Sequence, residues 1–119
     1  MFLRVKPGDP NTEQTITVVD DARVKVTLPS HQKSTEYSFS KVFGPESTQK
    51  EVFETVAGGL VTSLIANGKD GLIFSYGVTN SGKTFTVEGT KEQPGLIPQT
   101  LEKIFKSENI SAYISYLQM

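Results

Sequence analysis

The chain has 119 residues, enough for one domain of ordinary size, and its 12 Lys+Arg nearly balance its 13 Asp+Glu, so it offers no basic surface for nucleic acid. It has no cysteine, which excludes disulfides and thiolate metal sites, and it has neither the apolar start of a signal peptide nor a membrane span of about 20 apolar residues. We therefore expect one globular unit in the cytoplasm, with neither nucleic acid nor a membrane as its partner.

The first third of the chain is rich in predicted strands. Four segments carry β-branched or aromatic residues and end at turn residues. In chain order they are residues 2–6, 15–19, 24–28 and a segment marked by Tyr37, Phe39 and Val42. Residues 20–23 suit a hairpin connection between the second and third strands. The pattern predicts a small β-meander near the N-terminus.

A long helix is predicted over residues 49–67. Thr48 and the glutamate three residues later form a capping box, and Gly68 stands where a C-terminal cap is expected. Apolar residues recur every four positions and are expected to face the core: Val52, Val56, Leu60 and Leu64. Gly58 and Gly59 interrupt this pattern at a cost of about 1 kcal/mol each relative to alanine. They indicate either close packing or a weak helix.

The second half of the chain begins with a compact apolar segment, residues 72–76, which has no polar face. Such a run is typical of a strand covered on both sides. A glycine-rich loop, residues 77–84, follows it directly. Pro98 is then expected at the first position of a helix, and residues 111–119 begin another predicted strand. The apolar residues expected on one face of that helix are Leu101, Ile104 and Phe105.

The loop of residues 77–84 matches the phosphate-binding pattern G-x-x-x-x-G-K-[ST] at every fixed position. Its residues are Gly77, Val78, Thr79, Asn80, Ser81, Gly82, Lys83 and Thr84. The glycines let backbone N–H groups turn toward a phosphate, the lysine neutralises β/γ-phosphate charge, and the Thr84 hydroxyl is a ligand for Mg²⁺. Residue frequencies put a chance match at on the order of a few in a thousand. The sequence therefore predicts a nucleotide-binding loop.

Three other titratable residues are not predicted to take part in chemistry. Asp20 and Asp21 follow an apolar strand, as the acids that hold the Mg²⁺ shell do in many NTPases. However, they precede the phosphate loop in the chain and stand where a hairpin turn is needed, so a structural role is favoured. His31 lies in a polar loop and is expected to face solvent.

A longer pattern surrounds the phosphate loop. Residues 74–89 read F-S-Y-G-V-T-N-S-G-K-T-F-T-V-E-G, which resembles the kinesin signature F-x-Y-G-x-T-x-S/T-G-K-T-H/Y/F-T-M-x-G. Three more blocks agree in the same order. Residues 4–7 resemble R-x-R-P, residues 39–53 resemble F-x-x-V-F followed by T-Q-x-x-V-Y, and residues 95–98 resemble G-I-I/L-P. The chain thus resembles a kinesin motor domain over essentially its whole length.

The resemblance implies an α/β fold of the P-loop NTPase class, a three-layer sandwich with a mixed central sheet. Residues 1–119 are expected to be the N-terminal, incomplete portion of one such motor domain, because they contain neither the N-x-x-S-S-R-S-H nor the D-x-x-G-x-E segment that senses the γ-phosphate. No catalytic residue is expected among them. The full protein is expected to be a microtubule-stimulated ATPase. The alternative is a nucleotide-binding fragment without motor activity.

The resemblance also implies roles for single residues. Arg4 and Pro7 would border the adenine pocket of ATP, and Phe85 would pack on the base. Lys6 stands where the family usually has arginine, and an ammonium cannot reproduce the planar stacking of a guanidinium. Base contact at that position is therefore expected to be weaker.

Within the kinesins, residues 39–45 and 77–84 are most similar to the cytokinesis-associated, MKLP-type subgroup. The resemblance implies microtubules as the partner, bound through regions outside these residues. It also implies a cytoskeletal location, at the mitotic spindle or midzone. A coiled coil, also outside these residues, would make the full protein a dimer.

Overall fold

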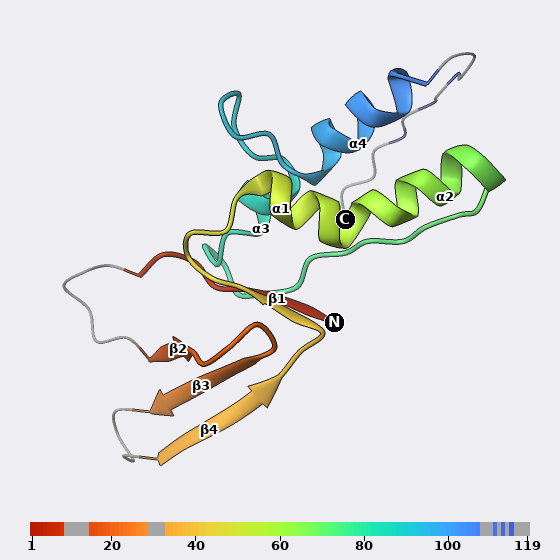
Figure 1. Ribbon diagram of the computed structural model, residues 1–119. Coiled ribbons are helices and arrows are strands. Elements are labelled where there is room, and N and C mark those ends of the chain that lie inside the picture. Colours follow the sequence, from red (N-terminus) through yellow and green to blue (C-terminus); the bar gives the residue numbers. More distant parts are fainter. Residues whose placement is uncertain (9–14, 29–32, 108–110, 112, 114, 116–119) are drawn as a thin grey trace.

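The structure is a computed structural model in which a strand-rich end and a helical end form an elongated molecule of 57 × 28 × 24 Å (Figure 1). His31 and most of the predicted strand at 111–119 lie outside the residues that it describes. The described residues are 1–8, 15–28, 33–107, 111, 113 and 115.

The strand-rich end is the predicted β-meander. Its strands are β2 (Ile16–Val18), β3 (Arg23–Leu28) and β4 (Lys33–Ser38), and they form one antiparallel sheet in the order β2-β3-β4. Val24 of β3 is paired with Val18 of β2 on one side and with Tyr37 of β4 on the other. Because side chains alternate along a strand, these three residues share a face of the sheet. The meander prediction is confirmed.

The turn between β2 and β3 is held by Asp20. One carboxylate oxygen accepts a hydrogen bond of 2.9 Å from the amide of Ala22, and the other accepts one of 2.8 Å from Nε of Arg23. The hydrogen bond from Arg23 lowers the pKa of the Asp20 carboxyl, and the positive charge of that residue acts in the same direction. Asp20 therefore serves the hairpin, as its place in the sequence predicts.

A second, two-stranded sheet joins the meander to the helices. Strand β1 (Phe2–Arg4) pairs in parallel with β5 (Lys41–Phe43), with Leu3 opposite Val42. The prediction of a single strand marked by Tyr37, Phe39 and Val42 is wrong, because this stretch contains two strands that belong to different sheets. The chain changes sheet at Phe39, whose amide donates a 2.7 Å hydrogen bond to the carbonyl of Ala22 in the hairpin turn.

The predicted helix 49–67 is present as three consecutive segments. They are α1 (Gln49–Phe53), a π-helical turn η1 (Glu54–Gly58) and α2 (Gly59–Asn67). The Thr48 hydroxyl accepts a hydrogen bond of 3.1 Å from the amide of Glu51. At the other end, Gly68 has a φ of 62° and its amide donates to the carbonyl of Leu64. The predicted glycine cap and the Thr48 half of the capping box are therefore confirmed, whereas the Glu51 carboxylate pairs with Lys41 at 3.2 Å.

The core lies between these helical segments, β5 and the last helix. Its buried residues are Phe43, Val52, Phe53, Ala57, Val61 and Leu96. The prediction that Leu60 and Leu64 face the core is wrong, because each of them is 40% exposed. A π-helical turn holds one more residue than an α-helical turn, so the core positions after it move one residue along the chain. Val61 and Ile65 accordingly take the places predicted for Leu60 and Leu64.

The two glycines inside the helix have different surroundings. Gly58 is buried, and its carbonyl accepts hydrogen bonds from the Thr62 hydroxyl at 2.8 Å and from Nζ of Lys103 at 3.1 Å. A Cβ atom on Gly58 would lie 3.1 Å from a carboxylate oxygen of Glu54, whereas one on Gly59 would meet no atom within 4 Å. Close packing therefore explains Gly58, and Gly59 only weakens the helix.

The last helix of the described chain is α4 (Leu96–Phe105), which packs against α1 and α2. Gly95 is its N-cap residue, so Pro98 occupies the third helical position, and the prediction that it stands at the first position is wrong. The N–H groups of the first turn have no partner within the helix. Proline at the third position therefore removes no helical hydrogen bond.

Residues 72–76 do not form the predicted strand. The stretch from Gly68 to Gly77 has no regular secondary structure, and Leu72, Phe74 and Tyr76 are 83%, 81% and 97% exposed. A strand requires neighbouring strands to accept its backbone hydrogen bonds. None lies beside this stretch among the described residues, and the apolar run remains uncovered.

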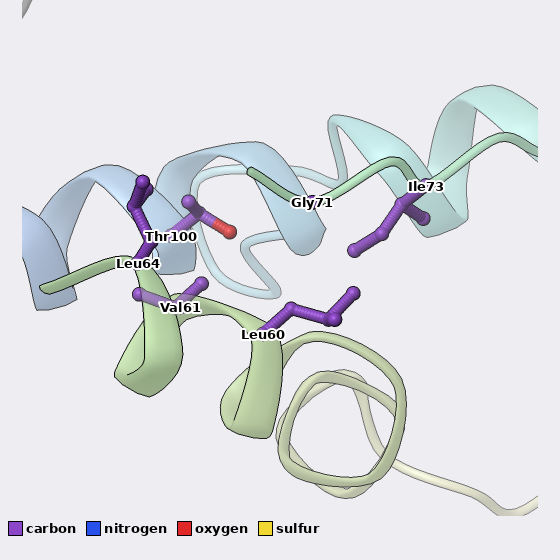
Figure 2. A pocket seen from close by; sticks show the side chains of 6 residues that line it. All are labelled: Leu60, Val61, Leu64, Gly71, Ile73 and Thr100. Carbon is purple, nitrogen blue, oxygen red and sulfur yellow. The ribbon is translucent and has the colours of Figure 1, made fainter. Parts of the chain in front are cut away.

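The same stretch runs back along α2 and forms a shallow pocket of about 120 Å³ with it (Figures 1 and 2). Its lining residues come from α2, from this stretch and from α4: Leu60, Val61, Leu64, Gly71, Ile73 and Thr100. Leu60 and Leu64 point into this pocket, which accounts for their partial exposure. The stretch then leads into the phosphate loop.

Candidate nucleotide-binding site

The loop of residues 77–84 is tightly folded on itself. A Cβ atom on Gly77 would lie only 2.5 Å from Oγ of Ser81, so a larger residue cannot stand at this position without a shift. Asn80 and Gly82 have φ angles of 63° and 96°, in the left-handed region that favours glycine and asparagine. The amide of Ser81 donates to the carbonyl of Val78 at 3.2 Å. The motif therefore forms a compact turn, and its last two residues begin helix α3 (Lys83–Val87).

Lys83 reaches back across this turn. Its Nζ atom donates hydrogen bonds of 2.7 Å to the carbonyl oxygens of both Gly77 and Val78. An ammonium group carries three N–H donors, so these two bonds leave one donor for a further acceptor. The loop thus holds a positive charge at its own opening, where an anionic oxygen could join its hydrogen bonds.

A small polar pocket of about 190 Å³ adjoins this lysine. It is lined by Ser75, Lys83, Thr84, Val87 and Glu88. Thr84 and Lys83 therefore line the same space. Mg²⁺ in proteins usually keeps several waters and binds through one or two side chains together with substrate phosphates. A threonine next to a lysine at such a pocket fits that kind of coordination.

Strand β1 and the residues directly after it bring two further cations to the loop. Nζ of Lys6 donates a 3.2 Å hydrogen bond to the carbonyl of Asn80, and the Arg4 guanidinium lies 5.1 Å from the centre of the Phe85 ring. Arg4 also donates to the Thr86 hydroxyl at 3.0 Å. Partial burial lowers the pKa of the Arg4 guanidinium through desolvation. The predicted grouping of Arg4 with Phe85 is therefore present, and Pro7 lies exposed just beyond Lys6.

Gln49 is a site residue that sequence reasoning missed. Its side-chain oxygen accepts a 2.6 Å hydrogen bond from Arg4, and its amide nitrogen donates to the carbonyls of Phe85 at 2.5 Å and Gln93 at 3.3 Å. Among the described residues, Gln49 is the buried polar side chain, only 7% exposed. Its place directly after Thr48, in the block that resembles T-Q-x-x-V-Y, was the available signal.

Residues 88–95 close a short hairpin beside the loop. Gly89 and Pro94 form a β-bridge, the amide of Thr90 donates to the carbonyl of Gln93 at 2.9 Å, and that of Gly95 donates to the carbonyl of Glu88 at 3.0 Å. This closure places the Gln93 carbonyl within reach of Gln49. One polar network thus joins helix α3, the hairpin of residues 88–95 and the start of α1.

The order and geometry of these elements agree with one protein family. The family model described as the kinesin motor domain matches residues 4–116. This chain belongs to the kinesin motor domain family. The family fold of the sequence-based prediction, a P-loop α/β fold, is confirmed with it, and the described residues show a portion of that fold.

Curated kinesins share substantial sequence identity with the chain. Kinesin-like protein KIF23 of Mus musculus is 41% identical over 116 residues, which cover 90% of this chain and 12% of the relative. Kinesin-like protein KIF20B of Homo sapiens is 50% identical over 78 residues, which cover 66% of this chain and 4% of the relative. The predicted similarity to MKLP-type kinesins is confirmed by the KIF23 match. The chain thus spans only a small part of the length of these relatives.

Solved kinesin structures match the fold. A structure described as kinesin 6 has a TM-score of 0.80 and 32% identity, covering 89% of this chain and 27% of its own. A second, described as KIF14 with ADP in complex with a microtubule, has a TM-score of 0.79 and 26% identity. The match covers 88% of this chain and 32% of the KIF14 chain. The kinesin fold is therefore present over most of this chain.

The described residues contain neither a clustered metal site nor a membrane-spanning helix. No group of three or more histidine, cysteine or acidic side chains among them is placed to hold a metal ion. Within the same residues, no helix combines the length and the apolar character needed to cross a membrane.

Proposed function

We propose that this kinesin chain binds ATP through residues 77–84 and forms the nucleotide-binding portion of a microtubule motor. One observation carries the proposal: Lys83 and Thr84 both line a single polar pocket at the end of the glycine-rich loop. A cationic residue and a hydroxyl-bearing residue side by side in the chain and at one pocket suit a phosphate group and its magnesium ion. The family membership favours ATP as the nucleotide.

Magnesium would be held at this site by the Thr84 hydroxyl and by phosphate oxygens, and would neutralise part of the phosphate charge. The chain's own contribution is to fix the backbone of Thr84. The carbonyl of Thr84 accepts hydrogen bonds from the amides of Glu88 at 2.8 Å and Gly89 at 3.2 Å, which fixes the residue at the start of α3. The main chain of the residue that carries the hydroxyl is therefore held by the helix.

The adenine base would lie against Phe85, at the edge formed by Arg4 and Pro7. Phe85 is 38% exposed, so part of its ring is available to an aromatic base. The Arg4 guanidinium, 5.1 Å from the ring centre, adds a planar cation on which a base can also stack. Lys6 instead holds the main chain of Asn80, which suits a role in shaping the loop.

At the level of the full protein, we propose a microtubule-stimulated ATPase of which residues 1–119 are the N-terminal part of the motor domain. The similarity to a KIF14 structure solved in complex with a microtubule supports tubulin as the partner. Contact with the microtubule, and dimerisation through a coiled coil, would involve regions outside these residues. The proposed location is the cytoplasm and cytoskeleton, at the spindle or midzone.

The experiment is a measurement of ATP binding and ATP hydrolysis by the full-length protein, with and without microtubules. We expect micromolar or tighter binding of Mg-ATP and turnover that rises when microtubules are added. Binding without stimulated turnover would instead support a non-catalytic nucleotide-binding role. Absence of Mg-ATP binding would refute the site itself.

A further inference from the structure

The hydrogen-bonding groups around the Gln49 side chain permit one orientation of its amide. A guanidinium can only donate, so the 2.6 Å contact with Arg4 requires the oxygen of the amide. The main-chain carbonyls of Phe85 and Gln93 can only accept, so they require its nitrogen. Every polar atom of this buried side chain is thereby used by a partner of the correct type.

Two of these partners belong to the proposed base contact. Arg4 supplies the guanidinium that lies over the Phe85 ring, and the carbonyl of Phe85 fixes the main chain from which that ring projects. Gln49 therefore holds both members of the cation–ring pair from one side chain. The Lys83 ammonium, in contrast, is held by carbonyls of its own loop, at Gly77 and Val78.

We infer that Gln49 is a positioning residue for the nucleotide base, which sets the relative placement of Arg4 and Phe85, while the phosphate loop is held by bonds from Lys83 and Lys6 that do not involve Gln49. This inference rests on the proposed function, because it assigns a role within the same site. It follows that Gln49 governs recognition of the base portion of ATP much more than recognition of its phosphates.

The consequence differs between two substitutions. Gln49→Met keeps a long unbranched side chain but leaves Arg4 without this acceptor and the Phe85 carbonyl without its donor. Gln49→Glu keeps an acceptor for Arg4 but sets a carboxylate against the Phe85 carbonyl, where like partial charges repel. Both disturb the main chain at Phe85, and only the first also removes an acceptor from Arg4, which keeps its bond to the Thr86 hydroxyl.

The experiment compares the affinity of the full-length protein for Mg-ATP with that for magnesium tripolyphosphate, which has the phosphates and lacks the base. The variants are Gln49→Met and Gln49→Glu. The matched control is Lys50→Met, because Lys50 is the next residue of α1 and its side chain is exposed. Thermal unfolding of each variant shows that it is folded.

We expect both Gln49 variants to lose about tenfold in ATP affinity, the order of effect of one hydrogen bond to a charged or buried group, with less than twofold change for tripolyphosphate. Lys50→Met should alter neither affinity by more than about twofold on the same scale. If Gln49→Met does not fold, Gln49→Glu decides alone, because it retains a partner for Arg4.

Equal losses for the two ligands, or no loss in either Gln49 variant, would overturn the inference and leave the proposed function standing. If the unmodified protein binds neither ligand, the proposed function is overturned as well. Binding of tripolyphosphate without preference for ATP would refute base recognition, and with it the role of Gln49.

Discussion

Nζ of Lys83 donates a hydrogen bond of 2.7 Å to the carbonyl oxygen of Gly77, the residue that opens the same loop. The two ends of the phosphate-binding motif are thereby joined across its turn. The ammonium does not depend on a distant element for its position, so the cation is available at the loop opening wherever the loop keeps its shape. The charge of Lys83 is the property that a phosphate would recognise.

Lys83→Ala is expected to weaken binding of Mg-ATP by roughly 10- to 100-fold, because a hydrogen bond to a charged group contributes about 1.5–3 kcal/mol. Isothermal titration of the full-length protein would measure the change. Lys69→Ala, at an exposed position beyond α2, is the matched control and should leave affinity unchanged. An unaltered affinity in Lys83→Ala would contradict the assignment of the loop.

Thr84→Ala is expected to act mainly on magnesium dependence. Removal of the hydroxyl takes away the side-chain ligand proposed for the ion, so a higher Mg²⁺ concentration should be needed for half-maximal ATP binding. Titration of Mg²⁺ at fixed ATP would show the shift. Thr84→Ser retains the hydroxyl and should behave like the unmodified protein; an identical Mg²⁺ requirement in Thr84→Ala would show that the hydroxyl is no ligand.

Phe85→Ala should lower the affinity for ATP far more than that for inorganic tripolyphosphate, since only ATP has a base to stack on the ring. The ratio of the two dissociation constants is the quantity to measure. Phe105→Ala provides a control, because this phenylalanine lies at the end of α4 and is 57% exposed. Equal losses for both ligands in Phe85→Ala would identify the ring as a packing residue only.

Gly59→Ala is expected to stabilise the protein by about 0.4–1 kcal/mol, because alanine restricts the unfolded chain at a site whose helical backbone it accepts. Gly59 has φ −69° and ψ −39°, and its Cβ would meet no atom within 4 Å. Gly58→Ala should gain less, since its Cβ would lie 3.1 Å from Glu54. Thermal unfolding of both variants tests this difference, and an equal or larger gain at Gly58 would refute the packing explanation.

Residues 1–119 expressed by themselves are expected to unfold without a cooperative transition and to show no microtubule-stimulated ATP hydrolysis. Leu72, Phe74 and Tyr76 are largely exposed in the described structure, and the stretch they occupy leads directly into the phosphate loop. Uncovered apolar residues with unpaired backbone groups favour aggregation over a stable fold. Calorimetry and an ATPase assay are the measurements. A sharp transition together with stimulated turnover would contradict this expectation.

Much of the local structure could be predicted because its causes are local. Thr48 and Gly68 cap the long helix through bonds to residues three or four positions away. Asp20 likewise holds its hairpin by bonding residues two and three positions along the chain. The wrong assignments have longer-range causes. The predicted single strand from Tyr37 to Val42 is divided because its two parts pair with different strands.

The phosphate-loop motif, the main helix and the family could be read from the amino-acid sequence, since each is a matter of residue type at fixed spacing. Which side chains meet at the site depends on the tertiary structure. Gln49 lies 45 residues from Arg4 and 36 from Phe85 along the chain, and its neighbours in the sequence predict neither partner. Their meeting depends on how β1, α1 and α3 pack, and a buried amide must satisfy its hydrogen bonds with whatever that packing brings within reach.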